Sequence, residues 1–305
     1  MPFSENTVYR LDFRIFYIYG HFILMTIRMV ERGAGMDNDF FSSRSRTDLA
    51  VELNDTVDKE DTAYKGVKVR EFTDGPTGIK ISQLTITDKD GERLFNKKQG
   101  TYITIEASEC CLGDEEYDNS LVNIITEQLF KLIEPLMVNN KNILVIGLGN
   151  RDITADSLGP DVVEGLLINR HIVNVTSDNY RLSSLVPGVM AQTGMETSQI
   201  IKGIVNTTKP GVVIAIDALA ARSVSHLNKT FQISDKGIHP GSGVGNHRAG
   251  ITSESVGVPV IALGVPTVIE MNNMFVTPKD VDIVVRANAE ILSDSINSLV
   301  YSYET

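Results

Sequence analysis

The sequence predicts an α/β fold, with a mainly parallel sheet, helices on both faces, and a small antiparallel β region near the N-terminal part. Two observations predict this class. Continuous apolar runs, typical of strands buried on both faces, alternate with segments of helical period in the second half of the chain. Shorter segments in the first half alternate apolar and polar residues, as half-exposed strands do. The 305 residues suffice for one large domain with a substantial core.

The antiparallel region is expected between residues 64 and 108. Its strands alternate apolar and polar side chains, and Asp90 with Gly91 offers a turn. The expected strands are 67–70, 79–82, 84–87 and 102–106.

The parallel part is expected to follow a helix over residues 121–137, which Asp118 or Asn119 could cap. Three apolar runs then predict core strands at 142–147, 212–216 and 258–263. Helical patterns lie between or after them, at 160–170, 193–207 and 280–302.

Composition excludes several function classes. Lys plus Arg is 28 and Asp plus Glu is 39, so the net charge is −11. This balance argues against direct nucleic-acid binding and against an anionic membrane surface as a partner, because both need clustered cations. The two cysteines, Cys110 and Cys111, are adjacent. They form no disulfide framework and no Cys-x-x-Cys metal site, and they favour a reducing compartment.

The N-terminal part differs in amino-acid composition from the rest of the chain. Residues 15–27 carry no charge, but 13 residues are too few for a membrane helix. Their length suits a signal-peptide core, yet no Ala-x-Ala site follows. Met36 begins a more conventional sequence. We therefore expect residues 1–35 to be a mis-assigned or disordered leader.

Two aspartates stand where an α/β sheet binds ligands, beyond the carboxyl ends of its strands. Asp156 lies in the loop after the first apolar run, and Asp217 directly follows the second. Paired carboxylates can share a proton, activate a water or bind a metal. The alternative is that Asp156 caps the next helix and Asp217 caps a turn.

A glycine-rich loop spans residues 237–250 and holds His239, His247 and Arg248. Glycines let a backbone approach a ligand closely. The loop could be a peptide-binding lip, a cradle of N–H groups for an oxyanion, or a metal site using one His; the alternative is a mobile surface loop.

Five stretches together resemble the germination protease family of spore-forming bacteria, which are endopeptidases that degrade small acid-soluble spore proteins. The stretches are 46–52, 147–160, 187–197, 215–223 and 238–246. The resemblance implies a zymogen that cuts itself between Asp48 and Leu49, with 36–48 as propeptide and 49–305 as a single α/β protease domain. It also implies a homotetramer acting during germination in the cytoplasm of the forespore or spore core.

Family substrates are cut within a Glu-(Phe/Ile)-Ala-Ser-Glu type of sequence, and residues 47–52 look similar. The junction would then mimic the substrate. The family's essential aspartates map onto Asp156 and Asp217. The fold is also similar to that of the hydrogenase maturation endopeptidases, in which acidic residues and a His bind nickel.

We therefore expect Asp156 and Asp217 to activate a water that attacks the scissile carbonyl. Backbone N–H groups of the glycine-rich loop could stabilise the oxyanion, and cationic side chains could pair with the acidic flanks of the substrate. The candidates are Gly241, Gly243 and Gly245 for the oxyanion, and Arg222, Lys236 and Arg248 for the flanks.

Two alternatives stay open. A metal-dependent endopeptidase would use Asp156 and Asp217 with His239 or His247, so a divalent metal is a candidate cofactor. A module that only binds spore proteins would form complexes without producing fragments.

Overall fold

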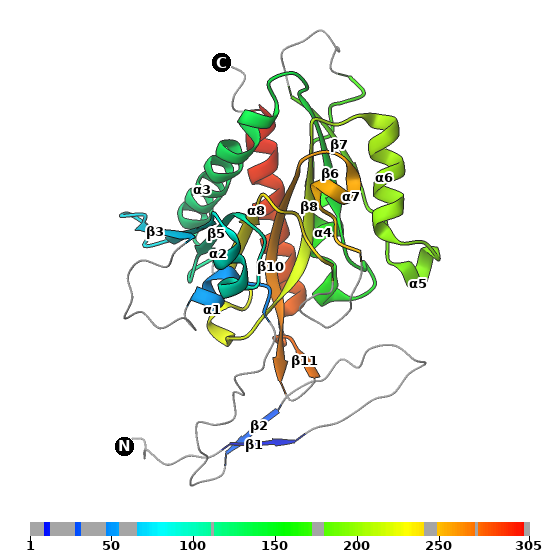
Figure 1. Ribbon diagram of the computed structural model, residues 1–305. Coiled ribbons are helices and arrows are strands. Elements are labelled where there is room, and N and C mark those ends of the chain that lie inside the picture. Colours follow the sequence, from blue (N-terminus) through cyan, green and yellow to red (C-terminus); the bar gives the residue numbers. More distant parts are fainter. Residues whose placement is uncertain are drawn as a thin grey trace.

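The computed structural model describes residues 9–12, 28–31, 47–54, 66–110, 113–172, 180–240, 249–271 and 274–301. Within this part of the chain, nine strands form one mixed sheet in the order β3-β4-β5-β9-β10-β8-β6-β7, with β11 paired to β10 (Figure 1). The strands are β3 (Val67–Thr73), β4 (Lys80–Ile86), β5 (Gly100–Glu106), β6 (Asn142–Gly147), β7 (Arg181–Leu185), β8 (Val212–Ala221), β9 (Thr230–Ser234), β10 (Val260–Met271) and β11 (Met274–Val276). A separate antiparallel pair joins β1 (Tyr9–Asp12) to β2 (Arg28–Glu31).

The sheet changes from parallel to antiparallel strand pairing between β10 and β9. Strands β10, β8, β6 and β7 are parallel to their neighbours in that order. Strands β3, β4, β5 and β9 pair antiparallel, and β9 also pairs antiparallel with β10. The α/β class is therefore confirmed, but "mainly parallel" is not exact. The antiparallel strands continue the same sheet through backbone pairing, instead of forming a small addition beside it.

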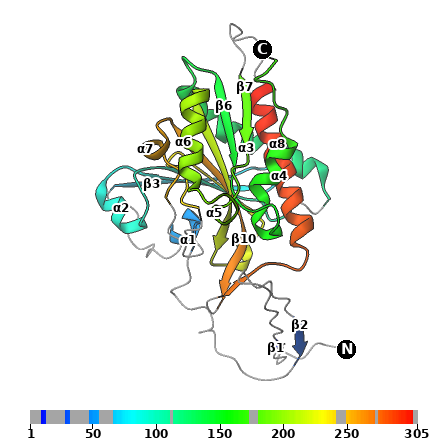
Figure 2. The ribbon, with the colours of Figure 1, turned by 90° about the vertical axis from the view of Figure 1, so that its right-hand side faces the viewer.

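Helices cover both faces of the sheet, as Figures 1 and 2 show. On one face, α3 (Glu115–Ile133), α4 (Leu158–Gly165) and α8 (Val281–Tyr301) enclose the largest cluster of buried apolar side chains. On the other, α6 (Thr197–Thr208) and α7 (Ser253–Val256) pack on the parallel strands, while α1 (Ala50–Asn54) and α2 (Lys89–Phe95) pack on the antiparallel ones. The short α5 (Met190–Thr193) precedes α6.

Local capping corrects two sequence expectations. Helix α3 is capped by Asp114, whose Oδ1 accepts from two backbone amides at 3.1 Å, and Asp118 lies inside the first turn. Asp90 and Gly91 form no hairpin turn, because Asp88 accepts their two amides and starts α2 there. In both cases an aspartate upstream of the expected position satisfies the first orphan N–H groups of a helix.

Strand β8 extends five residues beyond the expected end at 216. The backbone pairing with β10 continues as far as Ile269 opposite Ala221, whereas the pairing with β6 ends with Gly147 opposite Ile216. Asp217 therefore lies within β8 and not in the turn after it. Past Ile216 one edge of β8 has no β6 partner.

The described helices include none whose length and apolar character would let it cross a bilayer. The expected boundary at residues 35 and 36 lies outside the described part of the chain. The junction at 48 and 49 lies inside it.

Candidate active site

Asp217 is a buried carboxylate on a central strand. Asp217 is 5% exposed, and its Oδ1 accepts from the amide of Ala218 at 3.1 Å. This strand, β8, lies between β10 and β6, and Asp217 is the first residue of β8 beyond the end of its pairing with β6.

Asp156 is held in a tight turn after β6. It ends the 3-10 turn η3 (Thr154–Asp156), and the amide of Asn150 donates both to its carbonyl at 3.0 Å and to its Oδ2 at 2.9 Å. The buried Thr267 hydroxyl donates to the carbonyl of Ala155 at 2.6 Å. A Cβ on Gly149, which has φ +113°, would lie 2.0 Å from the carbonyl oxygen of Asp156, so only glycine fits there. Asp156 therefore closes its own loop and does not cap α4, whose N-cap is Ser157.

The two segments that carry these carboxylates adjoin. The amide of Leu148 donates to the carbonyl of Ile216 at 2.8 Å. A Cβ on Gly159 would lie 2.8 Å from the same carbonyl oxygen. The loop from β6 to α4 thus packs directly on the residue that precedes Asp217.

The open edge of β8 is occupied by the segment around the junction at 48 and 49. The amide of Asp48 donates to the carbonyl of Ala220 at 2.9 Å, and the amide of Ala220 donates to Asp48 Oδ2 at 2.9 Å. The following Leu49 is fully buried against Leu219, Ala221 and neighbouring apolar side chains.

Residues 50–52 continue this docking. Ala50 is 2% exposed and packs in the cluster that contains Phe95 and Tyr102. Glu52 is 4% exposed, and its carboxylate accepts from the amides of Arg222 at 2.8 Å and Ser223 at 2.7 Å. Burial of a carboxylate is costly unless it is hydrogen-bonded, and these two amides, together with the hydroxyl of Thr47, supply the bonds.

The carbonyl oxygen of Asp48 accepts two side-chain donors. Lys97 Nζ lies 3.0 Å away and Gln232 Nε2 lies 2.9 Å away. Gln232 also accepts the amide of Ala50 on its Oε1, at 2.6 Å. Burial lowers the pKa of Lys97 from its ordinary value of 10.5, and the nearby charge of Asp48 partly opposes that shift.

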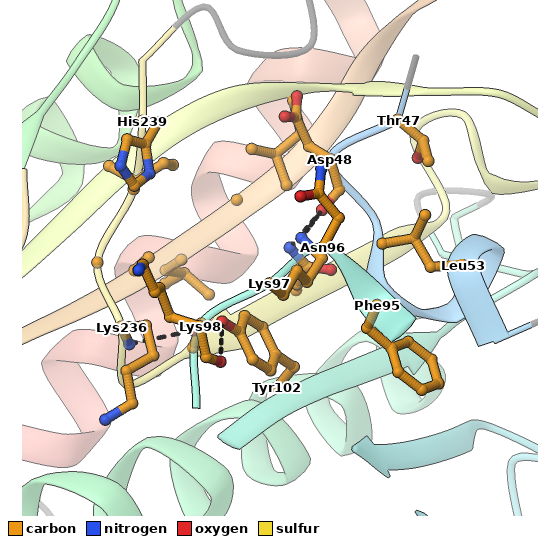
Figure 3. A pocket seen from close by; sticks show the side chains of 18 of the residues that line it. Thr47, Asp48, Leu53, Phe95, Asn96, Lys97, Lys98, Tyr102, Lys236 and His239 are labelled. Carbon is orange, nitrogen blue, oxygen red and sulfur yellow. Dashed lines mark hydrogen bonds between the residues drawn. The ribbon is translucent and has the colours of Figure 1, made fainter. Parts of the chain in front are cut away.

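A cavity of about 710 Å³ opens beside Asp48. Figure 3 shows its lining, with Lys97 and Tyr102 below Asp48, and Lys236 and His239 on the opposite wall. Its lining includes more basic than acidic side chains. The basic ones are Lys97, Lys98, Arg222 and Lys236, and the acidic ones are Asp48 and Glu92. This excess of positive charge suits an acidic peptide.

Five of the expected site residues lie outside the part of the chain that the structure describes: Gly241, Gly243, Gly245, His247 and Arg248. Of the described candidates, Arg222, Lys236 and His239 line the cavity, and Arg222 also binds Glu52 through its backbone amide. Among the described residues, no group of three His, Cys, Asp or Glu side chains could hold a metal ion.

Sequence reasoning missed Lys97 and Gln232. Gln232 is a polar side chain on a short alternating strand, and Lys97 follows a helix in a polar stretch. Neither position stands out without the pairing that brings it to Asp48.

Residues 45–274 match the sequence model of the germination proteases. The chain belongs to this family. A germination protease of Bacillus pumilus is 44% identical over 245 residues, which cover 76% of this chain and 65% of that protein. The Bacillus subtilis germination protease is 45% identical over 235 residues, covering 74% of this chain and 63% of that protein. The chain thus spans about two thirds of the length of these relatives.

Among solved structures, the chain is similar to the [NiFe] hydrogenase maturation protease HycI from Thermococcus kodakarensis KOD1. The identity is 20% and the TM-score 0.36, over 55% of this chain and 98% of the other.

Proposed function

We propose that this family member is an endopeptidase of spore germination, which cuts its own chain between Asp48 and Leu49 and then degrades small acid-soluble spore proteins. In this proposal residues 36–48 are the propeptide and 49–305 the protease domain, working as a homotetramer in the spore core. The observation that carries it is the docked junction: Asp48 pairs with Ala220 on the edge of β8 that is open beyond Ile216, and Ala50 and Glu52 bond to residues on β9 and just after β8.

The proposed reaction is hydrolysis by a carboxylate pair. Asp156 and Asp217 share one proton, and the ionised carboxylate takes a proton from water as the water oxygen bonds to the scissile carbonyl carbon. The protonated partner then supplies a proton to the leaving amine of Leu49. The adjoining β6–α4 loop and β8 support this pairing, because they carry the two carboxylates on neighbouring backbone.

The cavity beside Asp48 supports this substrate class. Acidic segments suit the basic cavity beside Asp48. A spore-protein segment with an acidic residue, a large apolar residue and an alanine in succession would reproduce what Asp48, Leu49 and Ala50 present.

The test is the intact mass of the full chain before and after incubation at mildly acidic pH, with N-terminal sequencing of any product. We expect a new start at Leu49, formed at a rate that dilution leaves unchanged. Asp156→Asn and Asp217→Asn should each abolish this product.

Asp152→Asn is the matched control, because Asp152 is an exposed carboxylate in the same loop, bonded to Gln192 at 3.2 Å. Full cleavage by either Asp156→Asn or Asp217→Asn would remove that residue from the mechanism. A binding module would give a different result. Both the full chain and a chain starting at Leu49 would then form complexes with spore proteins without producing any new fragment.

A further inference from the structure

We infer that Lys97 and Gln232 are catalytic residues of self-cleavage, which bind the carbonyl oxygen of Asp48 and stabilise the negative charge that develops on it. The inference rests on the proposed function, because that function makes the Asp48 carbonyl the scissile one. It adds two residues outside the carboxylate pair and the glycine-rich loop.

The first support is the geometry around one oxygen. Two N–H donors at 3.0 and 2.9 Å converge on the Asp48 carbonyl. Oxyanion sites use donors at about 2.7–3.1 Å, set before the reaction begins. One of the donors here belongs to a lysine side chain, which as an ammonium would favour the anionic oxygen over the neutral carbonyl.

The second support is that the peptide is clamped on both sides of the bond. Gln232 binds the carbonyl of Asp48 with its Nε2 and the amide of Ala50 with its Oε1, at 2.9 and 2.6 Å. Ala220 binds the amide and the carboxylate of Asp48. The bond between residues 48 and 49 is therefore held in one orientation, which is what positioning for attack needs.

The third support is the register of the sheet. Gln232 lies opposite Gly264 on β10, and Gly264 lies opposite Asp217 on β8. Residues paired in register project from the same face, so Gln232 and Asp217 stand in one row, with one strand between them. Two strand spacings correspond to about 10 Å between their Cα atoms. The carbonyl held by Gln232 thus lies on the face of the sheet that carries Asp217.

The surroundings of Lys97 fit this role. Its Nζ lies 5.3 Å from the centroid of the Tyr102 ring, whose π face attracts a cation. Burial makes an ammonium there poorly solvated, so new negative charge on the adjacent oxygen gains more than it would in water.

The step balances as an ordinary hydrolysis. The water oxygen bonds to the carbonyl carbon while the carbonyl electron pair moves onto the oxygen bound by Lys97 and Gln232. When that oxygen re-forms its double bond, the bond to the Leu49 nitrogen breaks. The nitrogen takes up a proton, and a carboxylate is left on Asp48.

The experiment compares self-cleavage rates of the full chain carrying Lys97→Met, Lys97→Arg, Gln232→Glu or the control change Lys89→Met. Intact mass gives the first-order rate of the product that starts at Leu49. Hydrogen exchange of the peptide that contains residues 49–54 gives the fraction of chains in which the segment is docked. The rate is divided by that fraction, so that loss of docking is not counted as loss of chemistry.

We expect Lys97→Met to lower the rate per docked chain by about 10²–10³-fold, as removal of one oxyanion donor does. Lys97→Arg keeps a cationic donor and should restore most of the rate. Gln232→Glu keeps the acceptor for Ala50 but loses the donor to Asp48, so it should also be slow. Lys89→Met, which removes an exposed lysine of α2 outside the cavity lining, should stay within about twofold of the unchanged chain.

Rates per docked chain that match the unchanged protein in both Lys97→Met and Gln232→Glu would overturn the inference and leave the proposed function standing. An unchanged chain that never yields a product starting at Leu49 would overturn both.

Discussion

Glu52 offers a sharp test of how the junction segment is held. Its buried carboxylate accepts two backbone amides, those of Arg222 at 2.8 Å and Ser223 at 2.7 Å. Glu52→Gln keeps the shape but puts an amide NH₂ where one of the two donors needs an acceptor. Hydrogen bonds to a charged group contribute about 1.5–3 kcal/mol each, and an unsatisfied buried donor adds its own cost. We expect the free energy of unfolding to fall by about 2–3 kcal/mol, on the same scale.

The fall would be measured by urea denaturation of the full chain, with intact mass confirming that the compared chains have the same length. Hydrogen exchange adds a local readout, because the amides of Arg222 and Ser223 should lose protection in the variant. The control is Glu127→Gln, which removes an exposed ion pair with Lys131 on α3 and should cost less than about 0.5 kcal/mol. If Glu52→Gln changed the unfolding free energy as little as the control does, and left both amides protected, the buried carboxylate would not be what holds the segment.

Two further predictions concern the site and its pH dependence. Thr267→Val removes the hydroxyl that donates to the carbonyl of Ala155 at 2.6 Å, so urea denaturation should show a loss of about 1–3 kcal/mol; the turn beside Asp156 should loosen, and cleavage should slow while the Glu127→Gln chain cuts normally. Because the folded pKa of Lys97 is lowered, the folded chain binds fewer protons than the unfolded chain between that pKa and 10.5, so the contribution of Lys97 to stability rises with pH across that window. The difference in unfolding free energy between the unchanged chain and Lys97→Met should therefore increase with pH up to about 10.5 and then level off; a difference that is flat over the alkaline range would contradict the lowered pKa.

Three strands of the parallel half, β6, β8 and β10, were predictable because their buried stretches read as apolar runs. Strand β7 was missed, because this edge strand is only partly buried and contains Ser183 and Ser184. Strand β6 matches its expected range of 142–147. The end of β8 was not predictable, because Asp217 interrupts the apolar run while the backbone pairing with β10 carries the strand on to Ala221. The continuity of the antiparallel strands with the parallel ones depends on β9 pairing with β5 and β10, and no local pattern shows that.

The candidate site likewise contains some residues that the sequence predicts and some that it does not. Asp156 and Asp217 could be picked out because each follows an apolar run, and the topology of α/β sheets says that such residues gather at one edge. Lys97 and Gln232 could not, because their role depends on contacts with Asp48 that span 49 and 184 residues. The spacing of residues along a chain carries no information about such pairs.

Those long spans also bear on the order of events during synthesis. The hydrogen-bond partners of residues 48–52 on β8, directly after β8 and on β9 lie 170 to 184 positions later in the chain. At about 5–20 residues per second, a ribosome needs on the order of 10–40 s to add the residues that separate the junction from these partners. The junction cannot dock during that interval. Closing so long a loop adds little entropic cost once the sheet exists, since each doubling of length costs only about 0.6 kcal/mol. The contacts that Gln232 and Ala220 make with Asp48 therefore form only after β8 and β9 have been synthesised and paired into the sheet. Any reaction that needs these contacts can begin only after that stage of folding.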